Sequence, residues 1–238
     1  MANKGLWWLV GGLLAAVFLL MLTKPPAEIS QMLFMISGEL KNYALLMHLV
    51  MLTALAAGLL MARARNLIFA GLMALLAGSA AAIGVVYFLL PNIVLFSLYV
   101  VLILLALIKG QLAWDFSRLR PAAWLFGIIG LVFGFWYLHW VESPIMLNAL
   151  FYSPLGILNC PTMITISGLL ILSSQRPVIL DFTTGLVSAC FGLYGIILLA
   201  AYVDMALVLC GLYQLARVAM VVRQELAARR GRRSIIYN

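Results

Sequence analysis

Seven residues in or beside the apolar segments of this chain could bind an ion, accept a proton or hydrogen-bond a small molecule. Polar and ionisable groups are costly to remove from water, so each one within an apolar segment is a candidate functional residue. Two histidines can also hold a haem iron. The seven candidates are His48, His139, Glu142, Cys160, Thr162, Thr165 and Asp204.

These residue types predict a binding pocket rather than a catalytic centre. No set of serine, histidine and acid accompanies them, and no pair of carboxylates lies within an apolar segment, which argues against a hydrolase. Cys160, Cys190 and Cys210 have neither C-x-x-C nor metal-site spacing. We therefore predict no catalytic residue and no metal site, and we expect binding rather than enzymatic activity.

The composition is that of a membrane protein. Apolar residues make up 66% of the 238 residues and charged residues only 9%, with a mean hydropathy of +1.15, whereas charged residues make up about 25% of a soluble domain. A chain of this length cannot bury so much apolar surface in one water-facing core. The sequence predicts an all-α, polytopic transmembrane helix bundle, and the net charge of +8 is expected to set its topology, with no nucleic-acid partner.

Span length divides residues 1–222 into eight predicted crossings of a single domain, because a helix needs about 20 apolar residues to cross a bilayer. The apolar run 178–222 is too long for one crossing, and Asp204 marks the turn that divides it. Pro91 and Asn92 are expected to form the turn between the third and fourth spans. The predicted spans are 5–23, 43–62, 67–90, 93–108, 121–140, 159–173, 178–201 and 204–222, followed by a basic tail, 223–238.

A short amphipathic helix is predicted over residues 27–40, directly after Pro25 and Pro26. Ile29 and Leu33 recur at helical spacing, so the segment is expected to lie on the outer membrane surface rather than to cross the bilayer. An ordinary ordered loop is the alternative.

The distribution of lysine and arginine along the chain predicts that both termini are cytoplasmic. In this orientation only Lys24 and Lys41 fall in outer loops, whereas every inner segment is positive, as is usual for cytoplasmic loops. Seven spans would instead place the arginine-rich tail outside. The inner basic residues are Lys4, Arg63, Arg65, Lys109, Arg118, Arg120, Arg176, Arg223, Arg229, Arg230, Arg232 and Arg233.

Two stretches carry a resemblance to a known family. In NCPTMITISGLLIL (159–172), Asn159 is expected to cap a helix that has Pro161 in its first turn; the second stretch is LLAAYVDMALVLCGL (198–212). They resemble a bacterial family of integral membrane proteins classified as a domain of unknown function. The resemblance covers the C-terminal third and implies a membrane fold without an assigned activity. The matching residues are Cys160, Pro161, Thr162, Thr165, Gly168 and Asp204.

The predicted topology gathers the candidate residues in the outer half of the membrane. We expect an outward-facing polar pocket that binds an ion, a quinone headgroup or a haem held between His48 and His139. Alternatively, His139 is a membrane-interface residue beside Trp140, and His48 only hydrogen-bonds a neighbouring helix.

Charged residues near the inner side predict two further features. Asp181 is expected to pair with Arg217 or Arg223 and so to join the last two helices, because a long arginine side chain can reach along a helix towards the interface. The tail is expected to bind anionic lipid headgroups through Arg229, Arg230, Arg232 and Arg233.

Small residues at four-residue spacing, such as Gly130 and Gly134, predict close helix packing within one bundle.

Two functions fit these features. One is a small transporter or ligand-binding protein of the bacterial cytoplasmic membrane that uses the outer pocket. The other is a non-catalytic membrane subunit that assembles with partner subunits into a larger complex, linked to quinone or haem.

Overall fold

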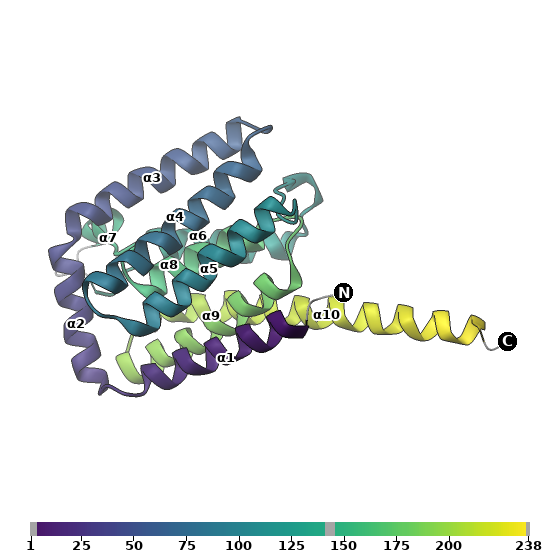
Figure 1. The fold of residues 1–238 in the computed structure, drawn as a ribbon. Helices are drawn as coiled ribbons and strands as arrows, with labels where there is room; N and C mark the ends of the chain where they lie inside the picture. The colour runs from purple at the N-terminus through teal and green to yellow at the C-terminus, as the bar shows by residue number, and fades with distance from the viewer. Residues whose placement is uncertain (1–3, 141–145, 237–238) are drawn as a thin grey trace.

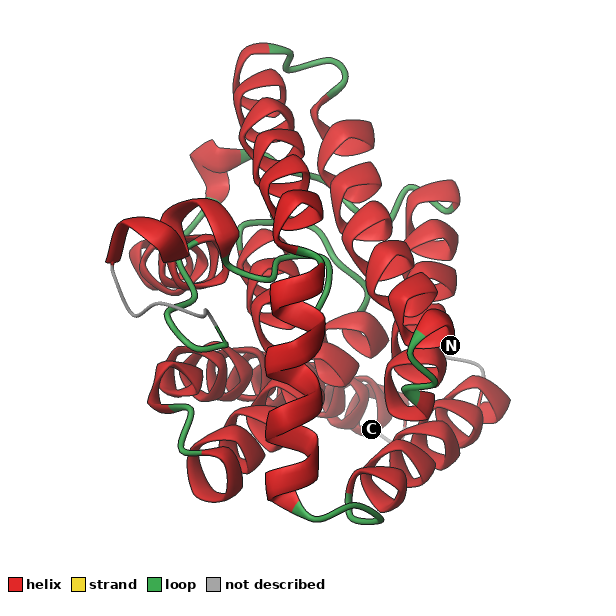
Figure 2. Ribbon diagram, turned by 90° about the vertical axis from the view of Figure 1, so that its left-hand side faces the viewer, coloured by secondary structure: helices red, strands yellow, loops and turns green. Residues whose placement is uncertain are grey.

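The computed structural model describes residues 4–140 and 146–236, and these residues are helical, without a β-strand (Figure 2). Two short 3₁₀ helices, Phe116–Arg118 and Tyr202–Asp204, lie between longer elements. The α-helices are α1 (Lys4–Met21), α2 (Pro26–Glu39), α3 (Lys41–Leu60), α4 (Arg65–Val86), α5 (Leu90–Ile108), α6 (Pro121–Phe135), α7 (Met146–Tyr152), α8 (Asn159–Ile171), α9 (Val178–Leu199) and α10 (Met205–Ile236).

Five helices in the described part of the chain are long and apolar enough to cross a bilayer. They are α3, α4, α5, α9 and the segment Tyr202–Ala228, which includes most of α10; the broken pair α1 and α2 would make a sixth. With 15 and 13 residues, α6 and α8 are apolar but shorter. At about 1.5 Å per residue, such helices fall short of the roughly 30 Å hydrocarbon core. These lengths indicate a membrane protein with five candidate spanning helices.

The long helices run roughly along one direction, and α2 lies across one end of the bundle (Figure 1). The most extensive contacts join α9 with α10, α4 with α5, and α6 with α8, while α1 packs on α5 and α9. We call the end that α2 crosses the α2 end; it contains the end of α1, the turn between α4 and α5, the start of α8 and the end of α9. The last turns of α10 extend beyond the opposite end (Figure 1).

The break between α1 and α2 follows from two consecutive prolines. Pro25 is extended, with φ −65° and ψ 145°, and Pro26 is the first residue of α2, where a missing N–H costs nothing. The two helices meet at 98°. As a result α2 packs across the bundle, where its Ile36 is buried in a cluster with Tyr137 and Trp140.

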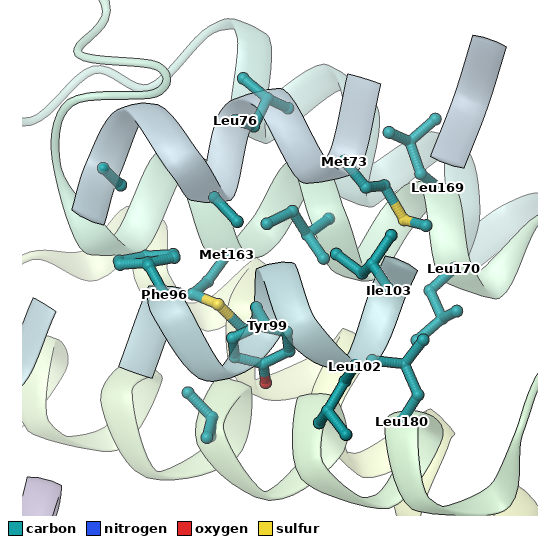
Figure 3. Packing of buried hydrophobic residues seen from close by; sticks show 14 of the residues in the cluster. Met73, Leu76, Phe96, Tyr99, Leu102, Ile103, Met163, Leu169, Leu170 and Leu180 are labelled. Carbon is teal, nitrogen blue, oxygen red and sulfur yellow. The ribbon is translucent and has the colours of Figure 1, made fainter. Parts of the chain in front are cut away.

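Leucine, methionine and aromatic side chains fill the centre of the bundle between α4, α5, α8 and α9 (Figure 3). Interhelical contacts of this kind are close-packed, so a change in the volume of one side chain disturbs the packing of several helices. The labelled members are Met73, Leu76, Phe96, Tyr99, Leu102, Ile103, Met163, Leu169, Leu170 and Leu180.

The turn between α4 and α5 differs from the predicted one. α4 ends at Val86, Phe88 adopts a left-handed conformation with φ 56°, and α5 begins at Leu90. Pro91 and Asn92 therefore lie in the first turn of α5 rather than in the connection, because proline fits a first helical turn.

Glycines allow α6 and α8 to touch through their backbones. A Cβ atom at Gly130 would lie 2.6 Å from the Cα of Gly168 and 2.9 Å from the carbonyl oxygen of Ile164. Gly134 faces Thr165 in the same way. The small-residue pair of α6 thus serves packing within the bundle, where dispersion contacts and small side chains, rather than water exclusion, favour helix association.

We expect Gly130→Ala to destabilise the protein by about 2 kcal/mol, because the added methyl group must separate two backbones. Gly71→Ala is the matched control, since a Cβ at Gly71 meets no atom within 4 Å; this substitution should leave stability unchanged or raise it slightly. Thermal unfolding of both variants in the same detergent measures the difference. Equal midpoints for the two variants would contradict the close contact.

Candidate functional site

A cavity of about 230 Å³ lies at the α2 end. Its wall is formed by the ends of α1 and α9, the start of α8, the turn between α4 and α5, and α2. Most of the lining is leucine, methionine, phenylalanine and other apolar side chains, as in many small-molecule sites. The polar lining residues include Thr23, Lys24, Tyr87, Asn92, Asn159 and Tyr194.

Asn92 contributes an unpaired carboxamide to this wall. Its side chain is in the first turn of α5, the residue is 3% exposed, and its Nδ2 is buried without a hydrogen-bond partner in the described structure. Buried polar groups are nearly always hydrogen-bonded, and an unpaired one costs about 1–3 kcal/mol. Because this nitrogen has almost no accessible surface, Asn92 meets the cavity through its other atoms.

Asn159 is a second unpaired amide in the wall. We predicted that it caps α8, but Leu158 occupies the N-cap position and Asn159 is the first helical residue, with no side-chain cap bond. The carbonyl oxygen of Leu158 already accepts from the N–H of Thr162 at 3.4 Å. The Oδ1 of Asn159 is buried without a partner among the described residues.

Helix α2 forms one wall of the cavity, and a polar contact lies near each of its ends. Lys24 Nζ lies 2.6 Å from Glu28 Oε1 at the bend, and the Tyr87 hydroxyl donates to Glu39 Oε2 at 2.7 Å near the end of α2. Between them, Met32 and Leu33 face the cavity. The Lys24–Glu28 pair is exposed and joins the bend to the first turn of α2, so of these two contacts the bond from Tyr87 to Glu39 is the one that connects α2 with another segment.

Asp204 lies directly behind the cavity wall. It is fully buried, its Oδ1 accepts a hydrogen bond from the Tyr137 hydroxyl at 2.7 Å, and the Cys160 thiol lies against the same carboxyl group. Its Oδ2 is directed at Gly195, where a Cβ would overlap it. Since Gly195 and Cys160 line the cavity, the carboxyl group is separated from the cavity only by the glycine backbone and the thiol.

A buried, non-helical segment supports the start of α8. Residues 153–158 are all buried, and Gly156 has φ 71°, which favours glycine. Its N–H donates to Thr162 Oγ1 at 3.0 Å and its carbonyl accepts from Ser79 Oγ at 2.5 Å. The Thr165 hydroxyl donates to the Pro161 carbonyl at 2.9 Å. Thr162 and Thr165 therefore satisfy backbone groups and do not line the cavity.

The two histidines are not arranged to hold a haem. His48 is 2% exposed, with Nδ1 2.7 Å from the Ala44 carbonyl oxygen and Nε2 2.9 Å from that of Phe135. Both ring nitrogens thus face backbone acceptors, and neither is free to bind iron. His139 packs against Trp140, with ring centroids 4.2 Å apart. Glu142 lies outside the described residues.

A metal site is likewise not apparent in the described residues, among which no group of three or more His, Cys, Asp or Glu side chains is suitably placed.

At the opposite end, Asp181 contacts two arginines. Its carboxylate lies 2.9 Å from Arg176 Nε and 3.3 Å from Arg217 Nε, and Gln214 Nε2 is 3.4 Å away. The contact with Arg176 is an ion pair without an aligned hydrogen bond. Arg176 also donates to the carbonyl groups of Leu170 and Ile171 at the end of α8 and to that of Ser173 just after it. Although burial lowers the pKa of Arg176 to about 10, the guanidinium stays charged at neutral pH.

The remaining predicted basic residues lie further along α10. Arg223 is exposed and makes no ion pair in the described structure. The two arginines beside Asp181 are therefore Arg217 and Arg176, and Arg223 is not one of them. Arg229, Arg230, Arg232 and Arg233 lie in the last turns of this helix.

Several residues of the site were not singled out by the sequence. Asn92 had been assigned to a turn, Arg176 had been counted only among the inner basic residues, and Tyr137 had not been named. The signal that could have identified Asn92 was its position: the predicted topology places it at the same membrane face as Asn159, beside a proline that fits a first helical turn.

Comparisons with known proteins do not extend these observations, because no family model, no curated protein and no solved structure matches the chain.

We expect Asp181→Asn to destabilise the protein by about 3 kcal/mol or more, because it leaves the buried Arg176 without its counter-charge. Arg217→Gln should cost less, since this side chain is 24% exposed. Arg223→Gln is the control on the same helix and should leave the thermal unfolding midpoint unchanged. If Asp181→Asn and Arg223→Gln unfolded at the same temperature, the ion cluster would contribute nothing to stability.

Proposed function

We propose that this chain is an integral membrane protein that binds a small molecule in the cavity at the α2 end. The observation that carries the proposal is a cavity whose wall is mostly apolar and includes a few polar residues, among them Asn92, Asn159 and Tyr194. A few polar groups in an apolar wall can orient a small molecule while the apolar side chains bury the rest of it.

The shape of the site also supports binding rather than a purely structural role. α2 begins at a bend of 98°, lines the cavity with Ile29, Met32 and Leu33, and is connected to Tyr87 through Glu39. A covered cavity with few polar groups in an apolar wall has the usual composition of a small-molecule site. Its volume of about 230 Å³ suits a ligand smaller than a typical drug, since drug-sized sites begin at about 300 Å³.

In the proposed topology, α1, α3, α4, α5, α6, α8, α9 and α10 are embedded in the bacterial cytoplasmic membrane, with both termini in the cytoplasm. The cavity then opens on the outer side. The excess of lysine and arginine in the segments assigned to the inner side supports this orientation. The short helices α6 and α8 fit a membrane interior because the buried segment between α7 and α8 has protein groups as hydrogen-bond partners.

The binding proposal predicts that a molecule copurifies with the protein. We expect organic extracts of protein purified from native membranes to contain a compound that is depleted in Leu33→Trp, because Leu33 lines the cavity and tryptophan would occupy part of it. The measurement is mass spectrometry of the extracts at equal amounts of protein.

Met35→Trp is the matched control, because Met35 is on the same helix but is 49% exposed and does not line the cavity. It should retain the compound at the wild-type level. An identical set of compounds in wild type and Leu33→Trp would argue against a bound ligand in this cavity.

The proposed topology predicts opposite labelling of the two ends in intact cells. A membrane-impermeant maleimide should label Gln31→Cys, an exposed position of α2, and should label Arg63→Cys, in the turn between α3 and α4, only after the cells are opened. The reverse pattern would invert the orientation.

A further inference from the structure

We infer that the cavity at the α2 end selects a small organic cation of the alkylammonium class, whose charge compensates the buried carboxyl group of Asp204 behind the cavity wall. This inference rests on the proposed function and specifies the charge of the molecule that the site binds. It follows from the environment of Asp204, from the thin wall in front of it, from the screening of Lys24 and from the aromatic part of the lining.

Asp204 has no counter-charge in the described structure. The residue is fully buried, and its Oδ1 accepts a hydrogen bond from the Tyr137 hydroxyl at 2.7 Å. Its Oδ2 has no hydrogen-bond partner, and the carboxyl group makes no ion pair among the described residues. A buried carboxylate without an opposite charge is costly, so a cation nearby would lower the free energy of its ionised form.

The wall between this carboxyl group and the cavity is thin. Gly195 and Cys160 both line the cavity, and the thiol of Cys160 lies against the carboxyl group. Oδ2 is directed at Gly195, where the Cβ of any other residue would overlap it. Because Oδ2 has almost no accessible surface, a cation would be attracted across the glycine backbone rather than bond to this oxygen. Such attraction persists in an apolar setting, since it falls only with the inverse of the distance and is little weakened at low dielectric constant.

The positive charge of Lys24 does not offset this attraction. Lys24 is the charged residue among the described lining residues. Its side chain is 52% exposed and its Nζ lies 2.6 Å from Glu28 Oε1, so water, salt and the glutamate screen its charge. Asp204 is shielded from water and keeps its full effect on the cavity. The electrostatic balance in the cavity therefore favours a cation over an anion.

The composition of the lining favours an organic cation over a metal ion. Inorganic cations need several oxygen ligands, and the described residues contain no group of three or more His, Cys, Asp or Glu side chains placed to hold one. An alkylammonium ion can instead be bound by apolar and aromatic side chains, because the faces of aromatic rings attract cations. The aromatic lining residues are Tyr87, Phe88, Trp140, Phe191 and Tyr194.

A purely structural role for Asp204 is the competing explanation, in which a permanently neutral carboxyl group only accepts the hydrogen bond of Tyr137. That role uses Oδ1 alone. It does not explain why the second oxygen is unpaired and turned towards the glycine of the cavity wall. The two explanations differ in what removal of the charge does to ligand selectivity.

Three probes of nearly the same shape separate the effect of charge from that of size: choline, its neutral analogue 3,3-dimethylbutan-1-ol, and the anion 3,3-dimethylbutanoate. We would follow thermal unfolding of the purified protein in one detergent, at fixed pH and ionic strength, as each probe is titrated. A ligand that binds only the folded protein raises the unfolding midpoint by mass action, and the dependence on concentration gives its apparent affinity.

Choline should bind at least about tenfold more tightly than the alcohol, a difference of about 1.4 kcal/mol, and the anion should bind most weakly. In Asp204→Asn this preference for choline should be lost, whereas the affinity for the alcohol should stay the same, because the carboxamide oxygen can still accept from Tyr137. Asp115→Asn is the matched control. Asp115 lies at the opposite end of the bundle, where its N–H donates to Ser174 just after α8, and its substitution should leave the preference intact.

The outcomes separate this inference from the proposed function. If the alcohol or the anion binds the unmodified protein as tightly as choline, or if Asp204→Asn keeps the full preference, the inference is overturned while the cavity remains a binding site. If no probe raises the midpoint but Leu33→Trp still loses a copurified compound, the inference fails and the binding function stands. If no such compound exists either, both fail. The three probes on the unmodified protein decide the charge of the ligand even where Asp204→Asn does not fold.

Discussion

Backbone N–H and C=O groups in the apolar interior need hydrogen-bond partners within the protein, and the other features of this structure depend on this constraint. In an apolar environment every unpaired N–H or C=O costs several kcal/mol, so irregular backbone persists only where protein groups pair with it. Ser79 and Thr162 do this for Gly156 in the buried segment before α8. This segment sets where α8 starts, and the start of α8 carries Asn159 and Cys160 into the cavity wall.

Buried polar groups are paired to different extents at the two ends of the bundle. At the end opposite α2, Asp181 and its two arginines balance charge against charge and join α8, α9 and α10. At the α2 end, Asp204 accepts from Tyr137 through one carboxyl oxygen, while its Oδ2, Asn92 Nδ2 and Asn159 Oδ1 are buried without a hydrogen-bond partner among the described residues. Natural structures keep few unpaired buried groups, and three of them, on Asn92, Asn159 and Asp204, belong to residues that form the cavity wall or lie directly behind it.

The covered cavity also depends on helix packing remote from it. Backbone contact at Gly130 and Gly168 holds α6 against α8, and α6 leads directly to Tyr137 and Trp140. Tyr137 positions the Asp204 carboxyl behind the wall, while Trp140 forms part of the wall and packs against Phe34 of α2 at a centroid distance of 5.1 Å. Because the interior is close-packed, the shape of the cavity is coupled to these contacts.

The amino-acid sequence by itself determined the helical class, the membrane character, the approximate position of the helices and the break before α2, because apolar periodicity and proline geometry are local properties. Tertiary structure decided which polar groups are paired. His48, Thr162 and Thr165 were predicted to bind a ligand, yet they hydrogen-bond to backbone groups from other segments or turns, and Asn92, which appeared to be a turn residue, lines the cavity. Pairing across helices depends on distances between residues remote in the chain, and residue type and spacing do not contain those distances.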